Sequence, residues 1–202
     1  MGSELHGVQM LVWDVPPAIE CGARFSFKVG VDCNARCSTV GWPLIIRDAA
    51  GHVLASVAIG DTVWPGTALH YAEVELEAPP AEGLHEWGAR LGAFAGSARH
   101  PETGVGFRVR TVPAPECVLR IVAIDGQTRA PIEGARVAAH PYRAVTNARG
   151  VAEIRLPKGA YRLFVSGRDY CPLRFDGTVE SDATIDAELV PACGPSDAEI
   201  WS

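Results

Sequence analysis

Cys33 and Cys37, whose thiols could form a disulfide or bind a metal, are the closest pair of cysteines in the chain, and they lie in a polar loop after a predicted strand. Two interpretations stay open for them, a disulfide that clips the loop or two unlinked thiols. The N-terminal residues carry no secretory signal as they stand, and without one we expect reduced thiols. The chain's six cysteines permit about 15 complete pairings: Cys21, Cys33, Cys37, Cys117, Cys171 and Cys193.

A zinc site at Cys33 and Cys37 would need two further ligands, because structural zinc is bound by four side chains. His52, His70 and the remaining cysteines are not spaced as a second half-site. The sequence therefore predicts no metal site around this pair.

Three histidines, His70, His85 and His100, offer another route to a metal, since three imidazoles can hold a catalytic zinc ion. Nothing in the sequence indicates that these three side chains lie close together in the fold. His70 and Tyr71 are adjacent, so they face opposite sides of a predicted strand. We predict no catalytic residue, no metal and no cofactor, and keep a metal-dependent enzyme that uses these histidines as the third of three hypotheses.

Other signatures of catalysis or nucleic-acid binding are missing from the sequence. It contains no G-x-S-x-G nucleophile motif and no glycine-rich phosphate loop of the GxGxxG or Walker type. The formal net charge is −6, and the lysines and arginines are scattered, so there is no basic footprint for nucleic acid. No apolar run approaches the roughly 18 residues that span a bilayer. We expect neither a nucleic-acid nor a membrane partner.

Aromatic residues outside the predicted core are the best candidates for binding a partner protein, because aromatic and arginine side chains dominate interface energetics. Trp13, Trp42 and Trp87 fall on predicted strands and are expected in the core. For residues 140–143 a solvated strand end and loop is the alternative to a binding patch. The predicted binding residues are Trp64, Pro65, His140, Tyr142, Arg143, Ile200 and Trp201.

The elements that position these residues are short strands separated by turns. Residues 23–31 alternate apolar and polar side chains, as a strand with one wet face requires. Asp48-Ala49-Ala50-Gly51 separates two apolar runs and predicts a hairpin turn. Seven such strands before residue 112 predict an immunoglobulin-like β-sandwich, although the Cys…Trp…Cys signature of antibody domains is absent.

The second half carries a spaced set of turn and strand residues. They run Asp125-x-x-Thr128-x-x-Pro131-Ile132-x-Gly134-Ala135-x-Val137, then Thr146-Asn147-x-x-Gly150, then Pro157-Lys158-Gly159-x-Tyr161, and close with Asp169-Tyr170. Over residues 116–190 this pattern resembles the carboxypeptidase regulatory-like domain, a family of transthyretin-like (prealbumin-like) β-sandwiches. Asn147 replaces the usual aspartate, and Asp169 the usual glycine. The resemblance implies a second β-sandwich.

The sequence therefore predicts an all-β protein of two β-sandwiches in tandem. The expected parts are an Ig-like sandwich at residues 1–112, a proline-rich linker at 113–116, a carboxypeptidase regulatory-like sandwich at 117–190 and a C-terminal tail at 191–202. Modules of that family accompany catalytic subunits or surface proteins, as the resemblance implies. We expect a cytoplasmic, non-catalytic accessory or structural subunit that binds another protein in a hetero-oligomer, within a multi-subunit enzyme complex.

A carbohydrate- or ligand-binding module of a cell-surface or exported system is the second hypothesis. It predicts a signal that was removed upstream and a Cys33–Cys37 disulfide. The transthyretin-like fold also hosts 5-hydroxyisourate hydrolases, which use histidines, an arginine and a C-terminal Tyr-Arg-Gly-Ser. The second half has only His140, and the sequence ends Ile200-Trp201-Ser202, so we predict that this activity is absent.

Overall fold

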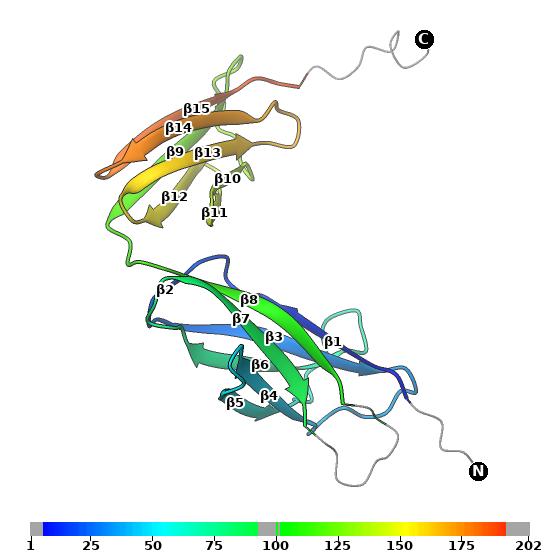
Figure 1. Cartoon of the computed structure of the whole chain (residues 1–202). Coiled ribbons are helices and arrows are strands. Elements are labelled where there is room, and N and C mark those ends of the chain that lie inside the picture. Colours follow the sequence, from blue (N-terminus) through cyan, green and yellow to red (C-terminus); the bar gives the residue numbers. More distant parts are fainter. Residues whose placement is uncertain (1–5, 93–99, 101, 193–202) are drawn as a thin grey trace, which may run out of the picture. The chain divides into compact units, whose positions relative to one another are not determined.

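The structure is a computed structural model that describes residues 6–92, 100 and 102–192 (Figure 1). The chain divides into two compact units, Met1–Val112 and Pro113–Ser202. Strands make up all the regular structure of the described residues, so the protein is all-β, as the sequence predicts. Within those same ranges no helix has the length and apolar character needed to cross a membrane.

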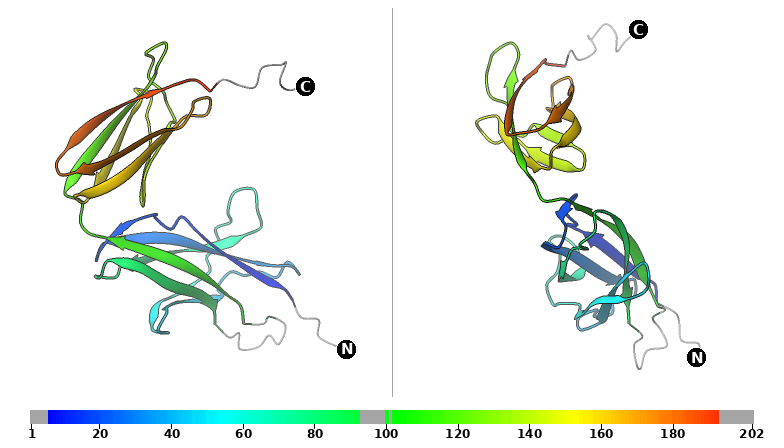
Figure 2. Two further views of the ribbon diagram at one scale, coloured as in Figure 1. Left: turned by 45° about the horizontal axis from the view of Figure 1, so that its top comes forward. Right: turned by 60° about the vertical axis from the view of Figure 1, so that its left-hand side comes forward.

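The first unit is a sandwich of a three-stranded sheet, β1-β3-β6, and a five-stranded sheet, β2-β8-β7-β4-β5. Both sheets contribute side chains to one hydrophobic core, and Figure 2 gives two further views of their strands. Strand pairs are antiparallel except β2, which runs parallel to β8. The strands are β1 (Val8–Trp13), β2 (Ile19–Glu20), β3 (Arg24–Cys33), β4 (Pro43–Asp48), β5 (Val53–Ala58), β6 (His70–Glu77), β7 (Gly83–Leu91) and β8 (Gly104–Val112).

Alternation along β3 explains why this stretch is a strand with one face in the core. Phe25, Phe27, Val29 and Val31 are buried, whereas Arg24 is exposed. Successive side chains of a strand point to opposite faces, so polar residues at every second position form the solvent-exposed outer face. The short strand β2 was not predicted, because two residues after a pair of prolines carry no periodic signal.

The second unit is also a sandwich, with a four-stranded sheet, β11-β10-β13-β14, and a three-stranded sheet, β12-β9-β15. Both sheets line its core. The pairs are antiparallel except β15 with β9. The strands are β9 (Cys117–Asp125), β10 (Arg136–Ala139), β11 (Tyr142–Val145), β12 (Val151–Leu156), β13 (Gly159–Ser166), β14 (Leu173–Val179) and β15 (Ala183–Leu189).

Two residues of the spaced pattern in the second half have clear structural reasons. The buried hydroxyl of Thr146 donates to the carbonyl of Ile132 at 2.6 Å and accepts from the amide of Ala135 at 2.8 Å. Gly150 has a φ of +73°, and a Cβ there would lie 2.5 Å from the carbonyl oxygen of Ala123. Only glycine fits such a left-handed position against a neighbouring backbone.

The structure refines two expectations near the candidate binding residues. Residues 142–145 form β11, an edge strand paired with β10, and not a loop. Four residues are too few for alternation to reveal a strand. The expected tail begins at residue 191, yet the amide of Ala192 donates to the carbonyl of Asp169 at 2.8 Å. Residues 193–202 lie outside the described ranges.

Candidate metal centre

Four side chains that can bind a metal ion meet where β3 ends: His6, Cys33, Cys37 and His100. Their ligand atoms all lie within 4.8 Å of one another. Within residues 6–92, 100 and 102–192, this is the one group in which three or more such side chains lie this close together. Two thiols and two imidazoles are the donor set of a common type of structural zinc site.

Three of the six donor–donor distances inside this Cys2His2 cluster lie within about 0.4 Å of the edges of a tetrahedron around a zinc ion. His6 Nδ1 lies 3.3 Å from His100 Nε2 and 3.2 Å from Cys37 Sγ, and Cys33 Sγ lies 3.6 Å from His100 Nε2. Zinc bonds of about 2.3 Å to sulfur and about 2.0–2.1 Å to nitrogen give ideal edges of about 3.3 Å between nitrogens and about 3.6 Å between nitrogen and sulfur. The observed separations therefore suit one ion bound by all four side chains.

The loop after β3 brings the two cysteines to the same side. Cys33 is the last residue of β3. The chain then turns, and the amide of Arg36 donates to the carbonyl of Cys33 at 2.8 Å while Arg36 adopts a φ of 56°. This tight turn returns the chain so that Cys37 reaches the thiol of Cys33 across a three-residue spacer, within the spacing that zinc-binding cysteine pairs use.

His6 is positioned by a pair of hydrogen bonds next to it. The amide of Asn34 donates to the carbonyl of Gly7 at 3.0 Å, and the side-chain oxygen of Asn34 accepts from the amide of Gly7 at 2.9 Å. This pair joins the beginning of β1 to the loop that carries the cysteines. The histidine that precedes β1 is thereby held over that loop.

The surroundings of the Cys2His2 cluster are largely apolar. Cys33 is buried, with 2% of its surface exposed, and the other three side chains are half-buried. The ring of His100 meets the buried ring of Trp42 edge-on, with centroids 4.7 Å apart, and the ring of His6 edge-on at 5.0 Å. An apolar wall of this kind orients a ligating histidine and limits access of solvent.

The sequence found half of this cluster. It singled out Cys33 and Cys37 but found no second pair of ligands, and it considered His100 only together with His70 and His85. The structure supplies His6 and His100 as that second pair. It forms no Cys33–Cys37 disulfide. The Cys-x-x-x-Cys spacing was the one local signal of the site.

His70, His85 and His100 do not converge. His70 lies on β6, whereas His85 Nε2 lies 2.8 Å from the hydroxyl of Thr111 and 3.2 Å from the carbonyl of Ala81. Of the three, only His100 belongs to a cluster of ligand atoms among the described residues.

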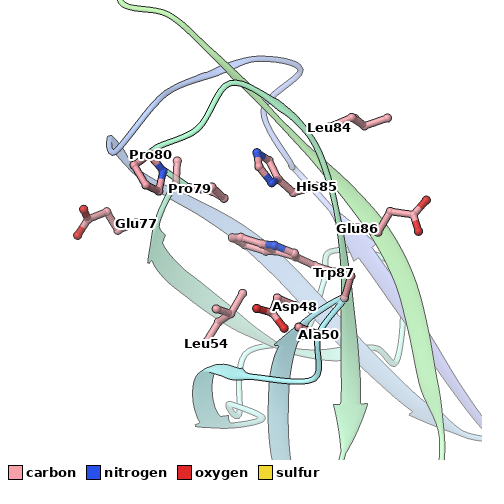
Figure 3. A pocket seen from close by; sticks show the side chains of 12 residues that line it. Asp48, Ala50, Leu54, Glu77, Pro79, Pro80, Leu84, His85, Glu86 and Trp87 are labelled. Atoms are coloured by element: carbon pink, nitrogen blue, oxygen red, sulfur yellow. The ribbon is translucent and has the colours of Figure 1, made fainter.

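A depression of about 740 Å³ lies beside His85, between the β4–β5 turn and the β6–β7 connection. Figure 3 shows the rings of His85 and Trp87 in it, with Asp48 beside the ring of Trp87, whereas the carboxylates of Glu77 and Glu86 point away from both rings. The side-chain and backbone hydrogen bonds from His52 hold the pKa of Asp48 below its usual value. Among the described residues, the hydrogen bonds of His85 go to the hydroxyl of Thr111 and the carbonyl of Ala81, and none goes to a carboxylate.

The predicted binding residues fall into separate places. Trp64 is 37% exposed, and its ring packs edge-on against Trp13 at 5.2 Å, with Lys28 Nζ 5.5 Å from the Trp64 centroid. Pro65 follows in an exposed turn. Trp42 and Trp87 are buried as expected, while Trp13 is half-buried.

In the second unit, His140 and Arg143 are exposed, and Tyr142 packs against Tyr161 with ring centroids 6.1 Å apart. Ile200 and Trp201 lie outside the described residues. The binding role of all these residues stays a prediction.

No family model matches the sequence, and no curated protein matches it. Among solved structures, the major pilin subunit BcpA of Bacillus cereus is 11% identical, with 93% of this chain and 71% of that chain covered and a TM-score of 0.34. A fragment of the ICAM-5 ectodomain is 14% identical, with 86% and 54% covered and a TM-score of 0.37.

A putative carbohydrate-binding protein from Bacteroides uniformis is 15% identical, with 38% and 42% covered and a TM-score of 0.31. This chain therefore spans about half or less of the length of the last two proteins. None of these likenesses carries a function over to it. The described residues themselves form an all-β protein of two sandwiches.

Proposed function

We propose that this chain is a non-catalytic accessory module that binds another protein through the outer face of the sheet β11-β10-β13-β14. The sequence resemblance of the second unit to carboxypeptidase regulatory-like domains supports an accessory role, because it implies a domain that supplies packing surface. The observation that carries the proposal is the row of side chains that crosses this face.

The row runs Arg143, Ala138, Phe164, Arg174 over the four neighbouring strands, as the strand registers place them opposite one another. Phe164 is 43% exposed although it lies in the middle of the sheet. Its neighbour on β10 is the small Ala138, so nothing large on that strand covers the ring. An exposed aromatic ring with arginines on both sides is the composition of the residues that contribute most to protein interfaces.

The charge of this face points to the chemistry of the partner. Its exposed arginines are Arg136, Arg143, Arg162 and Arg174. Arg162 and Arg174 share one carboxylate, that of Asp176, whereas Arg136 and Arg143 form no ion pair with the described residues. An acidic segment of the partner would complement this surplus of positive charge, and Phe164 would contact an apolar side chain within that segment.

Selection of peptides from a random displayed library tests this function. We expect acidic peptides with an apolar residue to be enriched, with affinities that fall as the salt concentration rises. The double variant Phe164→Ala/Arg143→Glu should lose at least tenfold in affinity. Leu84→Ala/Arg110→Glu is a matched control, because it changes an exposed apolar residue and its cross-strand arginine in the first unit.

Enrichment of basic or neutral peptides would refute the proposal. Equal affinity of the selected peptides for the wild type and for Phe164→Ala/Arg143→Glu would place their binding elsewhere on the molecule.

A further inference from the structure

We propose that His6, Cys33, Cys37 and His100 bind one Zn²⁺ ion, which fastens the residue before β1 and His100 to the end of β3. This inference is independent of the partner-binding function, since it concerns the first unit alone. It rests on the donor set, on the distances between the donors, on the failure of hydrogen bonding to explain those distances, and on charge.

The donor set and its number select the class of metal. Thiolate and imidazole ligands in a tetrahedral arrangement favour zinc over magnesium or calcium, which take oxygen ligands. Four protein ligands fill the tetrahedron, so the site is closed and structural, not catalytic. Such a site agrees with a module that carries no reaction.

Hydrogen bonds alone do not account for how close the donors lie. His6 Nδ1 contacts both Cys37 Sγ and His100 Nε2, and His100 Nε2 also contacts Cys33 Sγ. Each ring nitrogen carries either one hydrogen or one lone pair. All three contacts can be hydrogen bonds only if one proton or one lone pair is shared between two partners. A metal ion at the centre makes use of all the donors at once.

Charge also favours the ion. Two thiolates bound to Zn²⁺ with two neutral imidazoles form a group of zero net charge. Such a neutral group avoids the cost of an uncompensated charge next to the buried Cys33 and the ring of Trp42. The apolar wall is therefore compatible with a loaded site.

The three segments joined by the ion are far apart in sequence, since 31 residues separate His6 from Cys37 and 67 separate Cys33 from His100. In the three-stranded sheet, β1 is an edge strand that pairs with β3 alone. A metal bond to His6, just before its first residue, would resist the detachment of β1 from β3. The ion would thus act as a cross-link between non-local segments, as a disulfide does.

Metal analysis and Co²⁺ substitution of the purified full chain test this site. We expect one equivalent of zinc per chain by mass spectrometry of the elements. Co²⁺ added to the metal-free protein should give the intense visible absorption of tetrahedral cobalt together with a thiolate-to-cobalt charge-transfer band. Zn²⁺ should displace the Co²⁺ and abolish both signals.

The variants His6→Ala/Cys37→Ser and His52→Ala/Cys171→Ser make a matched pair, because each removes one histidine and one cysteine. The first double variant should lose zinc affinity by at least a hundredfold. The second, whose residues lie outside the cluster, should bind zinc as the wild type does. If the first variant fails to fold, the single variant His6→Ala should still shift the cobalt spectrum.

Any one of the following results would overturn the proposal. One is wild-type protein that binds neither zinc nor Co²⁺ in stoichiometric amount. Another is a Co²⁺ complex that lacks the charge-transfer band or prefers octahedral geometry. The last is unchanged binding in His6→Ala, or a mass two hydrogens lower that a peptide map assigns to a Cys33–Cys37 disulfide in freshly purified protein.

Discussion

Tyr170 donates a hydrogen bond from its phenol to the carboxylate of Asp125 at a distance of 2.8 Å. The other oxygen of the same carboxylate accepts from the amides of Gln127 and Thr128 at 2.8 and 2.7 Å. These bonds connect the turn after β9 to the segment that precedes β14. The Thr128 amide, then the Tyr170 hydroxyl and the Gln127 amide, lower the pKa of Asp125 to about 2.

The lowered pKa of Asp125 predicts that the second unit loses stability in acid. In the unfolded chain this carboxyl has its ordinary pKa of 3.8, so its stabilisation is complete above that pH and disappears as the pH falls from about 4 to about 2. Tyr170→Phe should weaken this pH dependence, because it removes one donor to the carboxylate. Urea unfolding at a series of pH values measures the pH dependence of the free energy of unfolding in both proteins.

Tyr161→Phe is the control for the tyrosine variant, because it removes a tyrosine hydroxyl that donates to a backbone carbonyl, that of Pro157, at 2.8 Å. It should leave the slope of stability against pH in acid unchanged.

At high pH the hydrogen bond between Tyr170 and Asp125 changes stability in the opposite direction. The bond to Asp125 raises the pKa of Tyr170 above 10.0, so its stabilisation is present below pH 10 and is lost as the pH rises through the raised value.

Gly150→Ala should strongly destabilise the second unit. Its φ of +73° costs an L-residue about 1–2 kcal/mol, and the added methyl group would overlap the carbonyl oxygen of Ala123. We expect a loss of about 2–4 kcal/mol in the free energy of unfolding. Gly177→Ala is the control, since no atom lies within 4 Å of the methyl position there, and it should change stability by less than about 1 kcal/mol. Equal losses in both variants would contradict this account.

Removal of zinc should lower the thermal midpoint of the first unit. A ligand that binds only the folded state stabilises it by about 2.7 kcal/mol when its free concentration is a hundred times its dissociation constant. Differential scanning calorimetry with added zinc or with a chelator measures the shift. His6→Ala, which leaves three of the four donors, should weaken the dependence on zinc, and His52→Ala should keep it in full.

Phe164→Ala should leave stability nearly unchanged, because the ring lies on the outer face of its sheet and is 43% exposed. Substitutions at such positions change the free energy of unfolding by about 0.5 kcal/mol or less. Urea unfolding checks this. Loss of peptide binding in a variant of normal stability then reports a lost contact, whereas a large destabilisation would show that Phe164 supports the fold.

The sequence predicts most strands of the fold because alternation is a local property. Residues such as Phe25 and Val29 mark the core face of β3 by their spacing alone. The short strands β2 and β11 were missed, since two and four residues do not establish a period. Their pairing depends on neighbours that are distant in the chain.

The candidate metal centre was likewise predictable from the sequence only in part. Cys33 and Cys37 are close in sequence and were singled out, but His6 and His100 come from segments that only the folded sandwich brings to them. No spacing rule links residues 31 or 67 positions apart. The row of Arg143, Ala138 and Phe164 likewise depends on the strand register, which the sequence pattern did not determine.

The place of His6 just before β1 has a chemical consequence. Proteolytic trimming of this residue would remove one imidazole and leave Cys33, Cys37 and His100 around the ion. A zinc ion with two thiolates, one histidine and an exchangeable water is the ligand set by which alcohol dehydrogenase polarises its substrate. With the proposed zinc ion bound, loss of His6 would therefore leave three protein ligands and a fourth position open to water, and the closed site would gain the donor set of a Lewis acid.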